Sequence, residues 1–505
     1  MVEQISTNKR IAKNTFLLYF RMFLIIGVTF YTTRVILNVL GVENYGIYTT
    51  IGGIVLLFSF INNALLTTTQ RYLNYYYGKN DITATGQYYS VCMFVFVFIG
   101  VVISLFSEMA GYLFIHYKMV LPCERIAAAE WTLHISVIIN FINIIRSPYH
   151  ACVVANEKFD FYAYLSIIEV LLKLVIVYIL SSIQFDKLIF YNLLLLSVTI
   201  VIFLVYKFYC NKKYVESKIQ YVTNKVLYKE VILFSGYSLL GNAANVCSQQ
   251  GISLLLNVFY GVIVNAAIGI SNQVSSGVYS FVSNFQTAFN PQLVKLYAQD
   301  ETWKLVNTIL SVSKFSFFLL FILIVPVIIY STDILKIWLV DIPDYTKIFC
   351  ILTLIYMLID TLAAPLWITI QASGHIKKYQ IITSIIILLN LPISLFFLNL
   401  GWKPTIVFII RILINLVAYA YRLYFANTIV YIGFSRYCLK VLLPILKVVL
   451  SIAVIYYFIL SIELNFILSI LILEMLLLVL IFCLGLSRNE ELFIIQLIKR
   501  GLKFI

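Results

Sequence analysis

Charged residues are scarce in this sequence. Only 11% of its 505 residues are Asp, Glu, Lys or Arg, whereas 62% are hydrophobic. Soluble globular proteins carry about a quarter charged residues, so that class is excluded. The eight cysteines are scattered and include no CxxC pair, so the sequence indicates neither a disulfide framework nor a zinc site. We therefore expect no metal and no cofactor.

Long polar connections and a cleavable signal peptide are also lacking. The first apolar segment is far longer than the 7–15 residues of a signal-peptide core, so we interpret it as the first permanent span. The longest outward connection, Ser331–Lys347, has room for one interfacial helix. A membrane polymerase or glycosyltransferase needs a larger loop to carry catalytic groups, which makes an enzyme the weakest of the alternatives.

The long apolar stretches predict an all-α polytopic membrane protein with about fourteen transmembrane helices. Each stretch is near the ~20 residues that ~30 Å of hydrocarbon requires. The fourth is expected at Ala127–Ile145 and the twelfth at Thr405–Asn427.

The basic residues sort by side. Of 36 Lys and Arg residues, 23 fall in the termini and the even-numbered connections, 6 in the odd-numbered connections and 7 within spans. This bias places both termini in the cytoplasm. The net charge of +14 is then explained by topology and anionic lipid, and no nucleic-acid motif is present.

A weak internal repeat supports two six-helix lobes. Leu37-Asn38-Val39 recurs as Leu256-Asn257-Val258, and Thr67–Asp81 resembles Thr287–Glu301, at offsets of 219 and 220 residues. Six spans per repeat give both copies the same orientation, so we expect a parallel pseudo-twofold with two extra C-terminal helices. The predicted domains are an N-lobe at 1–210, a cytoplasmic linker at 211–225, a C-lobe at 226–437, and the last two spans with a cytoplasmic tail at 438–505.

Polar side chains line one face of spans two, seven and eight at helical spacing. Such side chains are costly in hydrocarbon, so together they favour a hydrophilic cavity over isolated interhelical hydrogen bonds. The residues expected to line it are Asn63, Gln70, Asn245, Gln249, Asn272 and Gln286.

The cations within spans are the candidate site residues. Arg34 and Arg71 lead as groups that could hold a phosphate, with Arg21 and Arg411 behind them. Lys314 is close enough to the cytoplasm to be explained by snorkelling.

Four further charged residues lie in apolar spans. Glu169 and Lys173 are one turn apart, which fits either a self-neutralising pair or a coupling site. Asp360 and Glu474 have no opposite charge nearby in sequence, so each could carry a coupling ion or remain a neutral, hydrogen-bonded carboxyl.

The N-terminal third resembles a known family. NKRIAKNTFLLYFRMFL, followed by TRVILNVLGVENYGIYTT, is similar to the start of bacterial oligosaccharide-lipid flippases. These are the O-antigen and capsule repeat-unit translocases of the multidrug/oligosaccharidyl-lipid/polysaccharide exporter (MOP) superfamily. The segments Arg146–Leu180 and Pro291–Leu319 resemble it too, and the family's Arg…Leu-Gly…Tyr-Gly pattern falls on Arg34, Leu40, Gly41, Tyr45 and Gly46.

This resemblance implies two lobes in a V, a central cationic cavity and alternating access. The implied substrate is an undecaprenyl-pyrophosphate-linked oligosaccharide, flipped from the cytoplasmic to the periplasmic leaflet of the bacterial inner membrane. Other polysaccharide-export proteins are the implied partners, and the transport unit is expected to be a monomer. A multidrug antiporter of the same superfamily is the nearest alternative, although its cavity should favour carboxylates.

Overall fold

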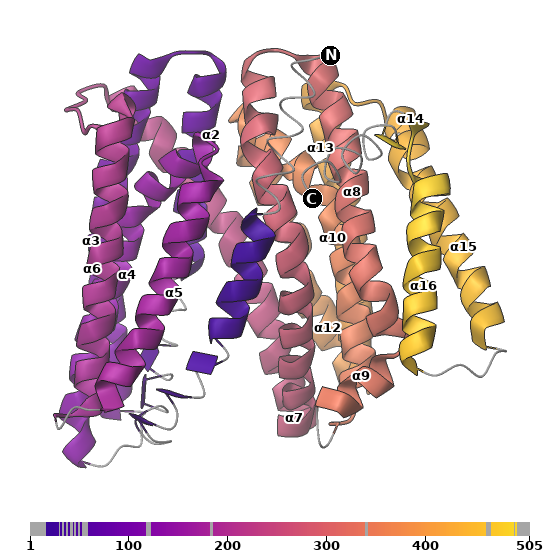
Figure 1. The fold of residues 1–505 in the computed structure, drawn as a ribbon, viewed down its shortest axis with the longest axis horizontal. Helices are drawn as coiled ribbons and strands as arrows, with labels where there is room; N and C mark the ends of the chain where they lie inside the picture. Colours follow the sequence, from indigo (N-terminus) through magenta and orange to yellow (C-terminus); the bar gives the residue numbers. More distant parts are fainter. Residues whose placement is uncertain are drawn as a thin grey trace, which may run out of the picture. The chain divides into compact units, whose positions relative to one another are not determined.

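The structure is a computed structural model, and every regular element in the residues it describes is a helix (Figure 1). The described residues are 17–29, 31–32, 35–36, 39–40, 44, 47–48, 51–52, 59–117, 123–181, 185–338, 342–460, 466–488 and 490–491.

Eleven of the helical segments in this part of the chain are long and apolar enough to cross a membrane, and the short helix Leu17–Thr29 is also apolar. The predicted all-α polytopic fold is thereby confirmed. The α-helices are α2 (Ser59–Gly78), α3 (Ile82–Tyr117), α4 (Ile126–Ala155), α5 (Phe159–Ser181), α6 (Lys187–Lys213), α7 (Lys225–Ala298), α8 (Thr302–Ile329), α9 (Ser331–Trp338), α10 (Thr346–Ser373), α11 (Lys377–Leu388), α12 (Asn390–Asn399), α13 (Thr405–Val430), α14 (Phe434–Tyr437), α15 (Leu443–Leu460) and α16 (Phe466–Leu480). The shorter elements are η1 (Cys123–Arg125), η2 (Val215–Ser217), η3 (Cys438–Leu442) and η4 (Ile481–Gly485).

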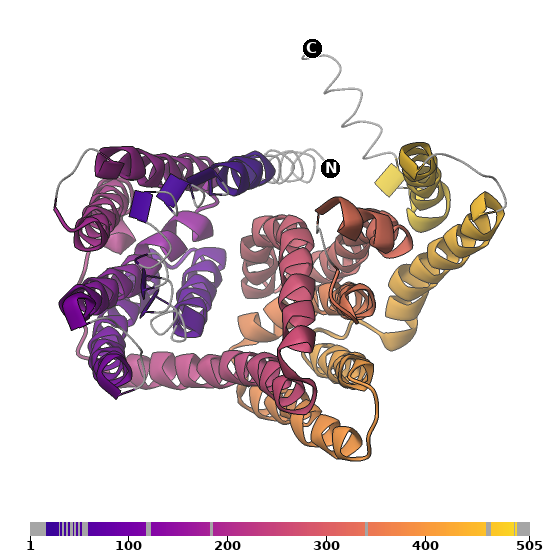
Figure 2. The ribbon, with the colours of Figure 1, turned by 90° about the horizontal axis from the view of Figure 1, so that it is seen from below.

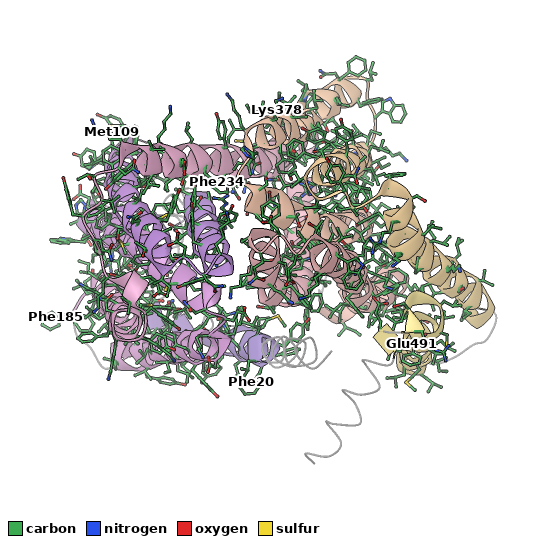
Figure 3. All side chains as sticks on the ribbon, turned by 90° about the horizontal axis from the view of Figure 1, so that it is seen from above. Phe20, Met109, Phe185, Phe234, Lys378 and Glu491 are labelled. Carbon is green, nitrogen blue, oxygen red and sulfur yellow. The ribbon has the colours of Figure 1, made fainter. Side chains whose placement is uncertain are left out.

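The apolar segments form helices because hydrocarbon offers the backbone no hydrogen-bond partners. In the first turn of a helix the backbone N–H groups have no partner within the helix, and polar side chains accept their hydrogen bonds. The Asp186 carboxylate accepts hydrogen bonds from the backbone N–H groups of Leu188 and Ile189 at the start of α6. Large apolar side chains such as Phe20, Met109 and Phe185 point outward (Figure 3), with more than half of each exposed, as expected for a surface in contact with lipid.

The internal repeat is visible in the helix boundaries. Four pairs of helices begin at corresponding positions in the two halves of the chain. Helices α3 and α8 begin at residues 82 and 302, and α4 and α10 begin at 126 and 346. Helices α5 and α11 begin at 159 and 377, and α6 and α13 begin at 187 and 405. The turns repeat as well, because Asn80 after α2 and Asp300 after α7 both have a left-handed φ of 56°. Offsets of 218 and 220 residues across the chain support the predicted parallel repeat.

The chain forms two compact units that each combine separate segments. Unit 1 contains residues 1–246, 287–300 and 371–384, and unit 2 contains residues 247–286, 301–370 and 385–505. The main core of unit 1 packs residues of α3, α4, α5 and α6, including Tyr89, Cys152 and Val177. In unit 2, Phe349 and Phe408 stack in the core, and α15 and α16 lie side by side (Figure 2). The predicted lobe boundaries stay a prediction.

Helix α7 turns back on itself. Its 74 residues would span roughly 110 Å if straight, more than three times the hydrocarbon thickness. Near its start the Phe234 ring lies 5.7 Å from the Tyr72 ring of α2, and at its end Ala298 packs against Gly78 of the same helix, so α7 must turn between these contacts. The predicted spans seven and eight are the two arms of this element.

Within unit 1, the ends of α2 and α7 pack at very short range. A Cβ added at Gly78 would lie 2.6 Å from the Ala298 Cβ and 2.8 Å from the Lys295 carbonyl oxygen. The rings of Tyr75 and Tyr297 face each other beside this contact, with centroids 6.5 Å apart. Only glycine allows the two backbones to approach this closely.

Replacement of Gly78 by alanine should therefore destabilise the protein. The new methyl group would overlap backbone atoms, and such overpacking costs about 1–3 kcal/mol. Gly236→Ala is the matched control, because this helical glycine has no atom within 4 Å of an added Cβ. Thermal unfolding of the purified protein in detergent should show a lower midpoint for Gly78→Ala and an unchanged or higher midpoint for the control. Equal midpoints would contradict the close contact.

Candidate functional site

The polar face of α5 carries a cluster of charged residues in unit 1. Glu169 accepts hydrogen bonds from two cations, with 3.2 Å between its Oε2 and Arg146 Nη1 and 2.9 Å between its Oε1 and Lys173 Nζ. Arg146 comes from α4 and Lys173 lies one turn along α5. One carboxylate thus neutralises only one of two neighbouring positive charges.

Arg21 adds a third cation to the same face. Its Nε donates a hydrogen bond of 2.5 Å to Ser166 Oγ, and its guanidinium lies 4.3 Å from the centre of the Tyr162 ring. Tyr162, Ser166, Glu169 and Lys173 follow one another by four, three and four residues, so they share one face of α5. We name Arg21, Arg146, Glu169 and Lys173 the α5 cationic cluster.

The electrostatics of the α5 cationic cluster favour an anion. Arg146 and Glu169 are each about four-fifths buried, and charges that lose water must find partners of opposite sign. Arg146 and Lys173 share the Glu169 carboxylate, and Arg21 binds Ser166 on the same face of α5, so the cluster has three cations and one carboxylate. Arginine supplies a planar fork of donors that fits phosphate or carboxylate oxygens, so the cluster can receive an anionic group.

Unit 2 contains a separate charged group between α10 and α13. Arg422 Nη1 lies 3.1 Å from Asp360 Oδ1. One turn earlier on α10, the Tyr356 ring lies 4.2 Å from the Arg411 guanidinium, and the Tyr356 carbonyl accepts a hydrogen bond from Asn415. Asp360, predicted as a possible ion-coupling carboxylate, is therefore already paired with a guanidinium.

Arg71 binds the end of a helix. Its Nε and Nη2 donate to the carbonyl oxygens of Gln371 and Ala372, at 3.2 and 3.1 Å, in the last turn of α10. The helix ends at Gly374, whose φ of +78° is left-handed, and a Cβ there would lie 2.5 Å from Arg71 Nη2. The guanidinium also lies 4.5 Å from the Tyr72 ring centre. Its role as a phosphate ligand stays a prediction.

The predicted polar cavity residues differ in their surroundings. Asn63 on α2 and Asn245 and Gln249 on α7 are exposed side chains. Gln286 is buried and donates to the Thr361 carbonyl. Gln70 and Asn272 are partly buried. The structure gives the exposure of each of these side chains separately. That they line one shared cavity stays a prediction.

Two further candidates stand apart from these groups. Arg34 lies outside the residues that the structure describes. Glu474 is half-buried on α16 and has no hydrogen-bond or ion-pair partner among the described residues. The described residues also contain no group of three or more His, Cys, Asp or Glu side chains that could hold a metal.

Sequence reasoning missed Arg146 and Arg422 as site residues because both were counted among the connections. Helix α4 continues through Ala155, ten residues beyond the predicted end of span four, so Arg146 lies well inside it. Arg422 lies inside α13, as it already did inside the predicted span Thr405–Asn427. The available signal was local spacing: Arg422 lies on the same face as Arg411 and Asn415.

Lys314 does not snorkel. Only 5% of its side chain is exposed, and its Nζ lies 2.6 Å from Glu490 Oε2, just beyond η4. The Ser487 backbone N–H and hydroxyl also donate to Glu490. Burial alone would raise the pKa of Glu490, but these hydrogen bonds and the charge of Lys314 outweigh it and hold this pKa below its usual value.

Comparison with solved structures identifies the fold. A crystal structure of MATE in complex with MaD3S superposes with a TM-score of 0.70 and 12% identity, covering 84% of this chain and 97% of that one. An outward-facing multidrug resistance MATE family transporter of the MOP superfamily gives 0.70 and 13%, covering 85% and 97%.

A third structure has a different reported character. It is a MOP superfamily transporter from Pyrococcus furiosus, whose reversed binding-pocket polarity is taken to suggest a different function. It superposes with a TM-score of 0.68 and 13% identity, covering 83% of this chain and 96% of that one. No family model and no curated protein sequence matches the chain. The chain therefore has the MATE-like fold of MOP transporters, and it is a multi-pass membrane protein.

The pair between Asp360 and Arg422 predicts a non-additive effect on stability. Arg422→Met leaves a largely buried carboxylate without its partner, which should cost up to about 3 kcal/mol of unfolding free energy. Adding Asp360→Asn removes that charge and should recover most of the loss. Arg411→Met is the control, since Arg411 faces a ring and should cost about 1 kcal/mol. Thermal unfolding in detergent compares Arg422→Met, Asp360→Asn, the double variant and the Arg411→Met control with the wild type, and additive losses in the double variant would argue against the pair.

The contact between Lys314 and Glu490 predicts a pH dependence. Because the folded pKa of Glu490 is lowered, its contribution to stability is complete above its unfolded pKa of about 4.3 and is lost as pH falls through the lower folded value. Glu490→Gln should therefore lower the unfolding midpoint at pH 7, and the difference from wild type should shrink toward pH 3. Glu491→Gln, next to it in sequence and labelled in Figure 3, should change little. A pH-independent difference would rule out ionisation of Glu490 as the cause.

Proposed function

We propose that this chain is a transporter that flips an undecaprenyl-pyrophosphate-linked oligosaccharide between membrane leaflets for surface polysaccharide synthesis. The observation that carries the proposal is the excess of cations in the α5 cationic cluster, where Arg146 and Lys173 share one carboxylate and Arg21 binds Ser166 on the same helix face. A pyrophosphate needs such cations, and the sugar chain needs neutral hydrogen-bond groups. The exposed amides of Asn63, Asn245 and Gln249 are of that kind.

The proposed setting follows from the distribution of Lys and Arg. The protein would lie in the bacterial inner membrane as a monomeric transport unit with both termini in the cytoplasm. The substrate would enter from the cytoplasmic leaflet and leave at the periplasmic leaflet by alternating access. Other polysaccharide-export proteins would act before and after it.

A multidrug antiporter is the second candidate, and the solved structures of the same fold favour it, since one of them is a multidrug resistance transporter. A cationic drug, however, requires a carboxylate that is free to pair with it. Glu169 and Asp360 are paired with basic side chains of this chain, which leaves Glu474 on α16 as the carboxylate among the predicted site residues without a partner in the described part of the chain. The P. furiosus transporter, with its reversed pocket polarity, supports the view that this fold does not dictate the charge of the substrate.

The two candidates predict opposite outcomes in cells. A deletion strain should accumulate lipid-linked repeat units in the cytoplasmic leaflet, and drug sensitivity should be unchanged. Restoring the chain with Arg146→Gln or Lys173→Gln should reduce polymer export at least about 10-fold at equal protein level, while Arg146→Lys should retain part of it because the charge remains. Lys336→Gln on α9 is the control for loss of an exposed cation. Normal export in the deletion strain together with increased drug sensitivity would select the antiporter.

A further inference from the structure

A groove runs along the outer surface of unit 1 between α5 and α6. It is lined almost entirely by apolar side chains and has a volume of about 450 Å³. Its lining residues are Phe161, Val201, Leu204, Val205, Phe208, Tyr209 and Lys212. Those from α6 recur every three or four residues, so they form one face of that helix.

A stacked aromatic pair belongs to the lining of the groove. The rings of Phe161 and Tyr209 are 3.7 Å apart and nearly parallel, with 10° between their planes. Lys213 Nζ donates a hydrogen bond of 3.1 Å to the Tyr209 hydroxyl, which holds the ring and brings a positive charge to the groove end. Phe208 forms an exposed wall, with 76% of its surface accessible. The groove is therefore shallow, and its apolar lining is open to the outside.

One end of the groove is basic. Lys212 belongs to the lining, Lys213 follows it, and Lys207 is exposed one to two turns earlier on the same helix. None of the three has a carboxylate within 4.0 Å among the described residues. On the α5 side of the groove, Asp160 is next to the lining residue Phe161. One carboxylate against three lysines leaves an excess of positive charge.

The length of the groove matches one membrane leaflet. Eleven residues separate Val201 from Lys212, which corresponds to about 16 Å along a helix. Half of the ~30 Å hydrocarbon core is about 15 Å. A lipid chain lying along Val201 to Phe208 would thus place its headgroup level with Lys212 and Lys213.

We propose that the α5–α6 groove is a binding site for one anionic phospholipid, with an acyl chain along its apolar lining and the headgroup phosphate at Lys212 and Lys213. The apolar lining selects an acyl chain, and the unneutralised lysines select a negative headgroup. This site is separate from the α5 cationic cluster and does not depend on the proposed transport function. Its occupant is a structural lipid of the membrane, recognised at the protein surface.

Native mass spectrometry of the full-length protein in detergent tests the charge requirement. Phosphatidylglycerol should bind more tightly than phosphatidylcholine with the same acyl chains. The double variant Lys212→Gln, Lys213→Gln should weaken phosphatidylglycerol binding about 30-fold, about 5-fold for each basic residue near an anionic group. The matched control is Lys377→Gln, Lys378→Gln, another adjacent exposed lysine pair, which should bind as wild type does.

A second pair of variants tests the groove itself. Leu204→Trp places an indole in the groove, whereas Ile200→Trp places one on a neighbouring position of α6 that does not line it; the two native side chains are similarly exposed, at 42% and 40%. Only Leu204→Trp should reduce phosphatidylglycerol binding, by about 10-fold or more. The proposal would be overturned if phosphatidylglycerol and phosphatidylcholine bound equally well. It would also be overturned if both lysine double variants lost phosphatidylglycerol binding equally, or if neither tryptophan variant reduced that binding.

Discussion

The free energy of placing a charge in hydrocarbon governs this structure more than any other term. A charged side chain at the centre of a bilayer costs at least about 2.5–3.5 kcal/mol unless a partner or water relieves it. Glu169 is met by Arg146 and Lys173, Asp360 by Arg422, and Lys314 by Glu490. The Asp360 pair joins α10 to α13, the Lys314 pair brings the segment after η4 onto α8, and Arg146 joins α4 to α5, whereas Lys173 lies on the same helix as Glu169. The same requirement that fixes the helix packing also leaves a surplus of positive charge on α5.

This requirement explains what could be predicted from the sequence. Hydropathy and the distribution of Lys and Arg depend on one residue at a time, so they predicted an all-helical membrane fold. Two pairs of matching short segments predicted a repeat at offsets near 220. The helix boundaries at residues 82 and 302, and at 126 and 346, follow that repeat. The helical fold and its boundaries can be predicted without knowledge of any tertiary contact. The reason is that the bilayer provides the apolar surroundings that the core provides in a globular protein.

The candidate site was less predictable because pairing is a property of two helices. Arg146 was assigned to a connection, because the neighbouring sequence does not show that α4 continues past Ile145. It also does not show that Glu169 of α5 pairs with Arg146. Arg71 looked like a free cation at the end of a polar stripe, although the carbonyl oxygens that it binds belong to residues 300 positions later. Only the Glu169 and Lys173 pair, one turn apart, could be anticipated, and it is present.

The division into two compact units has a mechanical consequence. The chain passes from one unit to the other five times, after residues 246, 286, 300, 370 and 384. Four of these passages lie within or at the ends of α7, α10 and the α11 segment, inside helices whose backbone hydrogen bonds are continuous. Neither unit can therefore be separated from the other without breaking continuous helices.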